Sequence, residues 1–414
     1  MKIIFIVAIY PPEREPSAVM AKEIAEHLRD LGHDVTIICP FPNRPKGKIF
    51  PEFRRSPKQV FDENGVKVIR VGTWLLGPDR KLRDRIMEGF SFGLSSSVAL
   101  LLDGPCDVLL LESWPIFGQL PAVLTAKSFG IPVVNYIKDI YPDAAIAAGI
   151  VAKSSISARI LEKLDSLICN ICVQNVLISE GMEDIYTKKR GMLKDKFTIC
   201  WDWLDLSEMK PINAGDSWRR EMGLSPEDFV CMYAGTFGLA SGVSTLLDVA
   251  DLVREREQIK IVCIGDGVLR EKLQREKIRR NLCNFLVLPF QPRERVPEVQ
   301  CSADVMILTS SPEMGSSSIP SKFITYLAIG NPTICAVART SDIGRTVEEN
   351  DIGRVVKPGV PNELAAAILE LEQMEKKKRM EIGARARHVA LSRYSIETAL
   401  ENITEILCRA AQKQ

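Results

Sequence analysis

The stretch from Ser311 to Ile334 contains residue types that can hold a phosphate group. It reads SPEMGSSSIPSKFITYLAIGNPTI and follows an apolar segment typical of a strand. Pro320 is a residue that commonly opens a helix, which places Lys322 in the first helical turn. A cation is unfavourable there unless an anion lies nearby, because the helix dipole is positive at that end. The same stretch carries one carboxylate and several hydroxyls, on Glu313, Ser316, Ser317, Ser318 and Ser321. We interpret it as a phosphate cradle; the alternative is a solvated loop with capping serines.

Two glycine turns earlier in the chain have a related character. The first, YAGTFGLASG (Tyr233–Gly242), ends a strand-like segment and precedes a helix-like one. Glycine lets the backbone approach a ligand closely, and the N-terminus of a helix offers N–H groups to phosphate. This turn could equally be a plain connection from strand to helix. The second turn contains Gly265, Asp266 and Gly267, where Asp266 either contacts a ligand or caps the following helix. Neither turn has the spacing of a dinucleotide fingerprint or of a P-loop.

The elements that must position these turns repeat one pattern along the chain. Short apolar segments, such as KIIFIVAIY, DVTIICPF and SLICNICVQN, read as strands and alternate with amphipathic segments such as the helix expected over 17–31. Strands that are apolar on both faces and alternate with helices predict a doubly wound parallel α/β sheet. The pattern is complete by about Lys189 and begins again near Asp228. It therefore predicts two facing Rossmann-like domains with a ligand cleft at the carboxyl ends of their strands.

A chain of 414 residues is too long for one ordinary core, which agrees with two domains. We expect an N-terminal domain over 1–199 and a C-terminal domain over 216–390. The stretch 200–215 lacks periodic order and contains Pro and Gly, which favours a linker. The final segment, 395–414, is an amphipathic helix that we expect to pack back on the first domain.

The composition excludes several classes of protein. Lys and Arg number 54 against 53 Asp and Glu, so the net charge of +1 provides no general attraction for nucleic acid. The 11 cysteines are scattered and odd in number, and no signal peptide is evident, which favours a reducing cytoplasm. Cys169 and Cys172 form a CxxC without a second pair, so we interpret them as buried apolar residues and not as a metal site. No stretch reaches the roughly twenty apolar residues that a membrane-spanning helix requires.

Basic and aromatic residues are interleaved over 44–59, and an apolar helix-like segment follows within 80–103. The basic residues of the first segment are Arg44, Lys46, Lys48, Arg54, Arg55 and Lys58, and they lie among Phe50 and Phe53. This pattern is typical of surfaces that dock on an anionic membrane, where each basic residue contributes about 1 kcal/mol. The alternative is a surface loop followed by a core helix.

In their order along the chain, the motifs YAGTFG, IGDGVLREKL and PSKFITYLAIGNPTI resemble the donor domain of the retaining family 4 glycosyltransferases. The N-terminal half is similar to the same family at YPPE, LRDLGHDVTIICP and KDIYPDAAIAAGI. The resemblance covers nearly the whole chain and is weakest over 44–100. It is greatest to the WbuB- and WcaI-like branch, which builds capsule and O-antigen repeat units.

The resemblance implies a GT-B fold and a hexosyltransferase that lies at the inner face of the membrane. The donor would be a sugar of N-acetylated hexosamine type on a nucleoside diphosphate, and the resemblance favours uridine as the nucleoside. The C-terminal domain would hold this donor. The acceptor would be polyprenyl-linked and held by the N-terminal domain, and transfer would retain the anomeric configuration. The family needs no bound metal and no further cofactor.

The resemblance also implies roles for individual positions in the donor site. The backbone of Gly235–Gly238, with Thr236 and Phe237, would approach the diphosphate, and Lys322 would neutralise it. The loop 288–291, with Phe290, would meet the base, and Thr325 would lie near the ribose. The remaining donor-site candidates are Asp266, Gly267, Ser317, Ser318 and Ser321.

Three departures from the family pattern affect the catalytic residues. Where the family has an E-x7-E pair, this chain has Ser317 and Thr325, so Glu313 is the candidate to replace the first glutamate. The basic residues that usually follow the glycine turn are missing from GLASG, which leaves Lys322 as the main cation on the leaving diphosphate. At KDIYPD the family's histidine is replaced, and Asp139 is either a catalytic carboxylate or a helix cap.

Two other functions are compatible with the sequence. A nucleotide-sugar 2-epimerase of the same fold would need a richer set of acidic and histidine residues in its cleft than His27, His33 and His388 offer. A degenerate scaffold subunit would explain the missing glutamate pair but not the retained PSK and GDG motifs.

Overall fold

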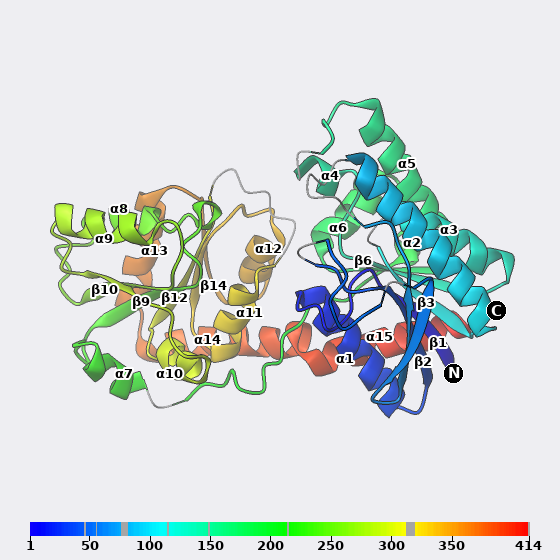
Figure 1. Cartoon of the computed structure of the whole chain (residues 1–414). Coiled ribbons are helices and arrows are strands. Elements are labelled where there is room, and N and C mark those ends of the chain that lie inside the picture. The colour runs from blue at the N-terminus through cyan, green and yellow to red at the C-terminus, as the bar shows by residue number, and fades with distance from the viewer. Residues whose placement is uncertain are drawn as a thin grey trace. The chain divides into compact units, whose positions relative to one another are not determined.

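The computed structural model describes residues 1–412, apart from 45–46, 55, 76–81, 114–115, 148–149, 213–214 and 312–318. The chain divides into two compact units (Figure 1). The N-terminal unit comprises Met1–Trp201 and Leu400–Gln414, and the C-terminal unit comprises Asp202–Ala399. Both are sheets covered by helices, and each is described by itself.

The sheet of the N-terminal unit has the strand order β3–β4–β2–β1–β5–β6–β7–β8. Its strands are β1 (Lys2–Ile6), β2 (Asp34–Pro40), β3 (Lys58–Glu63), β4 (Val66–Val71), β5 (Val108–Glu112), β6 (Val133–Ile137), β7 (Gln174–Leu177) and β8 (Phe197–Ile199). Neighbouring strands are parallel except for the antiparallel pair β3–β4 at one edge. The chain runs outward from β1 in one direction and resumes at β5 in the other, so the strand order reverses between β1 and β5.

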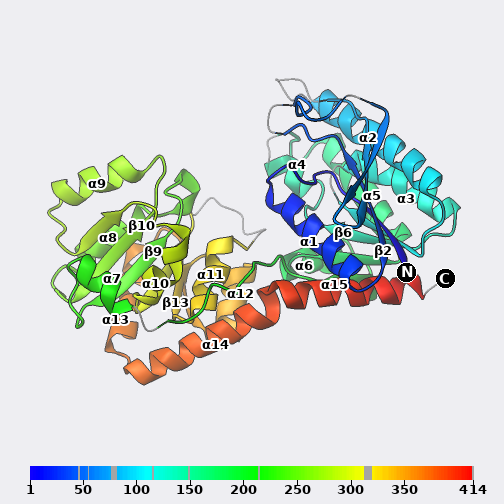
Figure 2. The same cartoon turned by 60° about the horizontal axis from the view of Figure 1, so that its bottom comes forward.

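Helices cover both faces of this sheet, which is why its central strands β1, β2, β5 and β6 are almost entirely buried (Figure 2). The helices are α1 (Pro16–Asp30), α2 (Leu82–Asp103), α3 (Ile116–Ser128), α4 (Asp143–Ala147), α5 (Ile156–Ile171), α6 (Glu180–Asp184) and, from Leu400 on, the C-terminal α15 (Ile396–Ala411). α2, α3 and α5 share a core with Ile4 of β1 and Leu109 of β5.

One strand prediction was wrong in this unit. The segment 166–175 was expected to be a strand, but α5 continues through Ile171 and β7 begins only at Gln174. A short apolar run does not distinguish a buried strand from a buried helix, and the buried Leu161, Ile168 and Cys169 follow helical spacing. Cys169 and Cys172 are both buried, and burial raises the pKa of the Cys172 thiol to about 12.

Among the described residues, one helix, α2, has the length and the apolar composition that a membrane-spanning helix requires. No such stretch was expected from the sequence. The window Ile86–Asp103 is 44% buried within the structure, and core helices commonly share this composition. α2 packs closely on α3, since a Cβ added at Gly93 would lie 2.5 Å from the carbonyl oxygen of Gly118.

The sheet of the C-terminal unit is parallel and has the order β11–β10–β9–β12–β13–β14. Its strands are β9 (Phe229–Ala234), β10 (Ile259–Ile264), β11 (Phe285–Leu288), β12 (Val305–Thr309), β13 (Thr333–Ala336) and β14 (Gly353–Val356). Its helices are α7 (Gly215–Glu221), α8 (Thr245–Leu252), α9 (Arg270–Arg279), α10 (Val296–Cys301), α11 (Ser321–Ile329), α12 (Asp342–Glu349), α13 (Pro361–Gln373) and α14 (Lys376–Tyr394). The strand order reverses between β9 and β12.

The segment expected to be a linker lies partly against the C-terminal unit. The backbone N–H of Leu204 donates to the carbonyl of Tyr394 at 3.1 Å. The guanidinium of Arg387 donates to the carbonyl of Met209 at 2.9 Å and also to that of Ala328. α14 thereby ties residues 204–209 to α11.

Candidate active site

The glycine turns and the lysine helix meet where the order of the C-terminal sheet reverses. The turn 235–238 follows β9, the turn 265–267 follows β10, and α11 follows β12 after the stretch 310–320. Helices leave the two sides of such a reversal in opposite directions, so the carboxyl ends of β9 and β12 border a crevice that binds ligands in open α/β sheets. Three of the sequence motifs therefore share one edge of one sheet.

Lys322 extends from the first turn of α11 toward the glycine turn after β9. Its Nζ donates to the hydroxyl of Tyr233 at 2.8 Å and lies 4.7 Å from the centre of that ring. A Cβ added at Gly235 would lie 3.3 Å from Nζ, so the ammonium group borders the turn directly. Burial lowers the pKa of Lys322, and no acidic group in the described part of the chain pairs with it. A half-buried ammonium without a carboxylate partner among the described residues is suited to an anionic ligand.

Two buried tyrosines hold α11 against β9, and the sequence analysis missed both. Tyr326 donates to the carbonyl of Ala234 at 2.6 Å and accepts from its N–H at 2.8 Å. Tyr233 donates to the carbonyl of Thr236 at 2.8 Å. Tyr326 lies four residues after Lys322 and therefore on the same side of α11. That spacing, together with a tyrosine near the end of an otherwise apolar strand, is the signal that could have revealed them.

The two glycine turns contact each other so closely that side chains are excluded. A Cβ added at Gly265 would overlap the carbonyl oxygen of Gly235, and one added at Gly267 would lie 2.7 Å from that of Phe237. The φ angles of Gly235, Gly265 and Gly267 are 149°, 154° and 145°, values that favour glycine. The N–H of Phe237 donates to the carbonyl of Asp266 at 2.8 Å. The side chain of Phe237 is fully buried, so this residue joins the two turns from the core side.

Asp266 does not cap α9, because the N-cap position belongs to Leu269 and no side chain accepts there. Its carboxylate instead accepts from the N–H of Gly267 at 2.7 Å and pairs with Arg270 at 3.0 Å. The Arg270 side chain is therefore a second cation beside the glycine turns, and the sequence analysis did not single it out.

The other donor-site candidates that the structure describes follow β11 or belong to α11. Thr325 donates its hydroxyl to the carbonyl of Lys322 at 2.9 Å, which leaves the oxygen able to accept. Ser321 is exposed at the start of α11, after the N-cap Pro320, and no side chain in the described residues caps this end. Phe290 follows β11 and is 56% exposed. Glu313, Ser317 and Ser318 lie outside the described residues.

Asp139 belongs to the N-terminal unit, where it follows β6. Its side chain is exposed, and its N–H donates to the Ser113 hydroxyl at 3.4 Å. α4 begins only at Asp143, so Asp139 does not occupy the N-cap position of that helix. The neighbouring Lys138 was not singled out from the sequence. Its Nζ donates to the Tyr136 hydroxyl at 2.8 Å and lies 4.1 Å from the ring centre, the same arrangement as Lys322 on Tyr233.

The C-terminal unit thus has the architecture of a nucleotide-binding α/β domain with a cation at its switch point. Comparison with known families agrees with that class. Residues 215–389 match the family described as glycosyl transferases group 1, and residues 17–184 match the glycosyl transferase 4-like domain.

Curated relatives at low identity have the same type of activity in their names. The probable glycosyltransferase WbjE of Pseudomonas aeruginosa is 24% identical over 73% of this chain and 72% of its own length. The putative colanic acid biosynthesis glycosyl transferase WcaI of Escherichia coli is 22% identical over 84% of this chain and 86% of its own length. The putative teichuronic acid biosynthesis glycosyltransferase TuaC of Bacillus subtilis is 22% identical over 90% of this chain and 89% of its own length.

Solved structures share the fold over the whole chain. Anabaena Alr3699/HepE, solved in complex with UDP, has a TM-score of 0.67 at 15% identity and covers 99% of this chain and 100% of that one. The sucrose-phosphate synthase of Thermosynechococcus elongatus has a TM-score of 0.69 at 14% identity and covers 100% of both chains. The protein therefore has the GT-B fold, as the sequence predicted.

The chain belongs to the group 1 glycosyltransferases. It is accordingly an enzyme of the glycosyltransferase class, which confirms the activity class implied by the three C-terminal motifs.

Proposed function

We propose that this glycosyltransferase moves a sugar of N-acetylated hexosamine type from a uridine diphosphate to a polyprenyl-linked acceptor, with retention, in polysaccharide biosynthesis. The observation that carries the proposal is the Lys322 ammonium beside Gly235, without an acidic partner among the described residues. Two relatives named for colanic and teichuronic acid biosynthesis support the pathway class. The UDP bound to HepE supports the nucleotide. In this proposal the C-terminal unit holds the donor and the N-terminal unit the acceptor.

The proposed chemistry is mainly electrostatic. The bond between the anomeric carbon and the diphosphate oxygen breaks, and negative charge develops on the leaving diphosphate while the sugar becomes oxocarbenium-like. Lys322 and the N–H groups at the start of α11 would stabilise that charge, and more strongly in a buried setting than in water. The acceptor hydroxyl forms the new bond, and its proton passes to a carboxylate, for which Glu313 and Asp139 are the candidates.

We assign the remaining donor contacts to residues that follow the strands of the C-terminal sheet. In this proposal the exposed ring of Phe290 stacks on the uracil base, and the Thr325 hydroxyl accepts from the ribose. The N–H groups of the turns 235–238 and 265–267 would contact the diphosphate. Ser321 would add a hydroxyl, as would Ser317 and Ser318. The relatives' names favour transfer over epimerisation or a purely structural role.

The affinity for UDP is expected to fall at alkaline pH, starting below the ordinary lysine pKa of 10.5. Burial lowers the pKa of Lys322, whereas a bound diphosphate raises it, so binding takes up a proton between the two values. Affinity is full below the lowered pKa and declines about tenfold per pH unit above it. Calorimetric titration of UDP against pH measures this decline.

Lys322→Arg is the matched control for the pH profile, because a guanidinium stays charged throughout. Its UDP affinity should remain flat over the same alkaline range. A wild-type profile as flat as that of the arginine variant, or no UDP binding at any pH, would contradict the assignment of Lys322 to the diphosphate.

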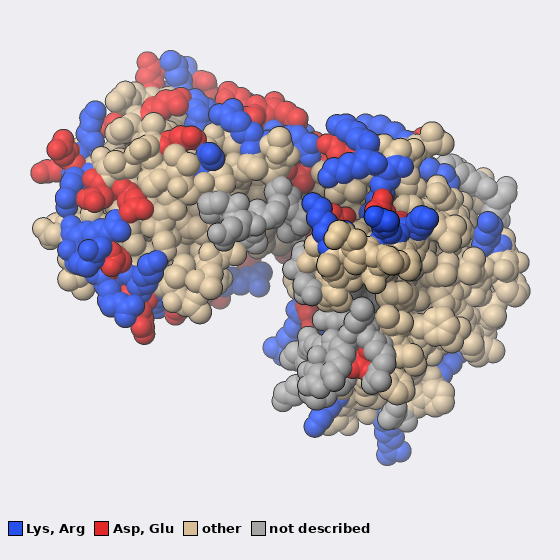
Figure 3. Space-filling view, turned by 90° about the horizontal axis from the view of Figure 1, so that it is seen from above, with Lys and Arg blue, Asp and Glu red and all other residues tan. Residues whose placement is uncertain are grey.

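We further propose that the N-terminal unit docks on the membrane that holds the acceptor, through an apolar face formed by α2, α3 and α5. On α2 the exposed side chains recur at helical spacing along one side. The apolar face consists of Met87, Phe90, Leu94, Val98, Leu101, Leu102, Leu124, Phe129, Ile156, Ile160 and Leu167, each at least 41% exposed. Seen from this side, the unit presents a broad surface with few charged side chains, bordered by Lys and Arg (Figure 3).

The structure changes which residues support docking within the expected segments 44–59 and 80–103. Phe50 and Phe53 line a pocket, so they are poor candidates for insertion into lipid. Lys48 and Arg54 are exposed and remain candidates for contact with anionic lipid. Lys46, Arg55, Arg80 and Lys81 lie outside the described residues. In the second segment the apolar side of α2 provides the main support.

The double substitution Phe90→Glu/Leu102→Glu is expected to lower partitioning onto vesicles of phosphatidylcholine and phosphatidylglycerol by about tenfold or more. These side chains are 50% and 68% exposed, so the fold should tolerate the change while lipid contact is lost. Co-sedimentation with vesicles measures the effect. Ile278→Glu, which replaces a 78% exposed side chain of α9 in the other unit, is the control. Equal partitioning of the double variant and the control would argue against docking through α2.

A further inference from the structure

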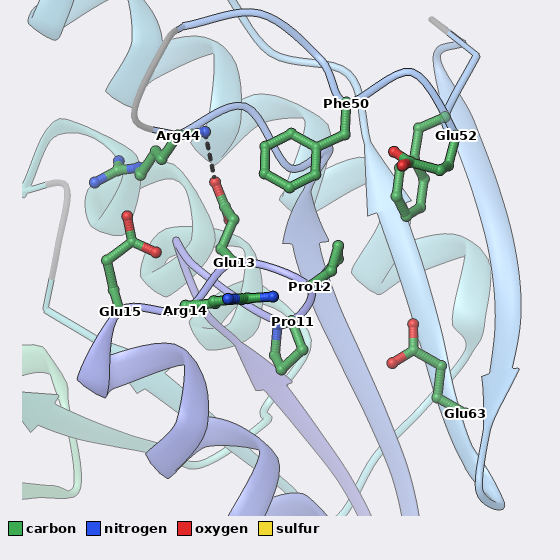
Figure 4. A pocket seen from close by; sticks show the side chains of 10 residues that line it. Pro11, Pro12, Glu13, Arg14, Glu15, Arg44, Phe50, Glu52 and Glu63 are labelled. Carbon is green, nitrogen blue, oxygen red and sulfur yellow. Dashed lines mark hydrogen bonds between the residues drawn. The ribbon is translucent and has the colours of Figure 1, made fainter. Parts of the chain in front are cut away.

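The N-terminal unit contains a pocket of about 990 Å³ beyond the carboxyl ends of β1 and β2 (Figure 4). One side is formed by residues 11–15, which follow β1 and lead into α1. The other side is formed by the segment after β2, through Arg44, Phe50, Glu52 and Phe53, with Glu63 of β3 at the border. The segment 44–53 belongs to the part of the chain where the resemblance to the family was weakest. The shape of this pocket is therefore expected to be particular to this protein.

Glu13 holds the two sides of the pocket together. Its side chain is buried, at 4% exposure, and its Oε1 accepts from the backbone N–H groups of Asn43 at 3.0 Å and Arg44 at 2.9 Å. Figure 4 shows the second of these bonds crossing from the first side to the other. A carboxylate that accepts two backbone hydrogen bonds at the base of a loop sets the direction in which the loop continues. Glu13 thus positions the segment that carries Phe50.

The aromatic side of the pocket is packed against neighbouring rings and a buried guanidinium. Phe53 packs edge-on against Phe41 and Phe61, with ring centres 6.4 Å and 5.8 Å apart. The guanidinium of the fully buried Arg70 lies 4.8 Å from the centre of the Phe53 ring. Phe50 faces Arg14 and Pro12 across the opening (Figure 4). An aromatic ring opposite proline offers an apolar platform of the size of a pyranose.

Acidic groups outnumber basic ones among the side chains that line the pocket, and one of the acidic groups, Glu63, is paired with the buried Arg70 at 3.4 Å. Among the described lining residues there are two cations, Arg14 and Arg44, and four carboxylates, Glu13, Glu15, Glu52 and Glu63. The guanidinium of Arg44 also lies 3.9 Å from Glu88. A phosphate or a uronic acid placed here would meet more negative than positive charge. Carboxylates and guanidinium groups, on the other hand, accept from and donate to sugar hydroxyls.

We propose that this pocket binds an uncharged sugar ring of the acceptor, stacked on Phe50 and hydrogen-bonded by the surrounding Glu and Arg side chains. The proposal rests on the glycosyl-transfer function put forward above and adds the class of acceptor. The acceptor carries a neutral sugar at this position, and its pyrophosphate and any acidic sugar lie elsewhere. Glu13 acts as a positioning residue for the pocket wall.

Saturation-transfer NMR on the full chain tests the proposal with simple probes. The neutral probes are methyl glucoside, methyl galactoside and the methyl glycoside of N-acetylglucosamine; the charged ones are methyl glucuronide and glucose 6-phosphate. We expect signals from at least one neutral glycoside and none from the charged probes. Phe50→Ala should reduce the neutral signal about tenfold, since an aromatic platform dominates such contacts. Glu13→Ala should reduce it as well, through the displaced wall.

Two further variants make the test specific. Trp74→Ala removes an aromatic side chain that is 51% exposed in the same unit but outside the pocket, and it should leave the signal unchanged. Glu52→Lys reverses one charge at an exposed position and should bring glucose 6-phosphate into contact. Neutral glycosides that give no signal, or a signal that survives Phe50→Ala, would overturn the proposal. Binding of the charged probes to the wild type with the same strength as the neutral probes would also overturn the proposal.

UDP calorimetry on the same variants separates this proposal from the proposed function. Phe50→Ala and Glu13→Ala change the N-terminal unit only, so their UDP affinity should equal that of the wild type. If the wild type gave a signal from neutral glycosides but did not bind UDP, the result would count against the proposed donor and not against the pocket. Normal UDP binding with no sugar signal would count against the pocket alone.

Discussion

Lys322→Ala is expected to lower kcat for sugar transfer by about a hundredfold to a thousandfold. The substitution removes the ammonium that lies beside Gly235, where the proposed mechanism has charge develop on the leaving diphosphate. Losing one well-placed charge-stabilising group commonly costs a reaction this much. The measurement is transfer of labelled N-acetylhexosamine from UDP to a polyprenyl-linked acceptor in vesicles, with the release of UDP recorded in parallel.

Two further variants separate the role of the Lys322 charge from that of its hydrogen bond. Lys322→Arg keeps a cation but exchanges a point charge for a planar group, so it should retain more activity than alanine. Tyr233→Phe removes the hydroxyl that accepts from Nζ at 2.8 Å and should have a much smaller effect than Lys322→Ala. If the alanine variant transferred sugar at the wild-type rate, Lys322 would have no role in the departure of the diphosphate.

Gly265→Ala is expected to lower the free energy of unfolding of the C-terminal unit by about 2–5 kcal/mol and to weaken UDP binding. The new Cβ would overlap the carbonyl oxygen of Gly235, and alanine at a φ of 154° is strained in addition. The turn 235–238, which borders Lys322, would have to shift to make room. In a unit of this size the loss corresponds to a fall in Tm of roughly 5–15 °C.

Gly238→Ala provides the matched control in the neighbouring turn. An added Cβ there meets nothing within 4 Å, and its φ of −89° suits any residue. The change should leave Tm within about 2 °C of the wild type. Thermal unfolding followed by calorimetry, combined with UDP titration, compares the two variants. Equal Tm values would show that contact between the turns does not hold the site together.

The fold and the meeting of three motifs at one edge of a sheet could be predicted because both depend on local patterns. Apolar segments that alternate with amphipathic ones require a parallel α/β arrangement wherever they occur, since both faces of each strand must be covered. The three motifs each end a strand, and the carboxyl ends of parallel strands meet at one edge of a sheet. Lys322 was correctly placed in the first turn of its helix, because Pro320 marks the start of a helix within two residues.

Other features depend on partners that are distant in the sequence. Tyr326 bonds Ala234 across 92 residues, and Lys322 bonds Tyr233 across 89, and no local pattern specifies such a pair. Phe50 and Phe53 looked like membrane anchors in a basic loop. Only their packing beside Glu13, Phe41 and Arg70 reveals the wall of a pocket.

The sequence by itself determined that the chain forms parallel α/β units, and that glycine turns and a lysine follow the strands of the second. Hydrophobic periodicity and backbone preference act over one or two helical turns, and the sequence displays them directly. The tertiary structure alone decided which side chains the lysine meets, where α5 ends and what the aromatic residues after β2 surround. Those outcomes follow from packing between segments far apart in the chain, where shape and burial select the partners.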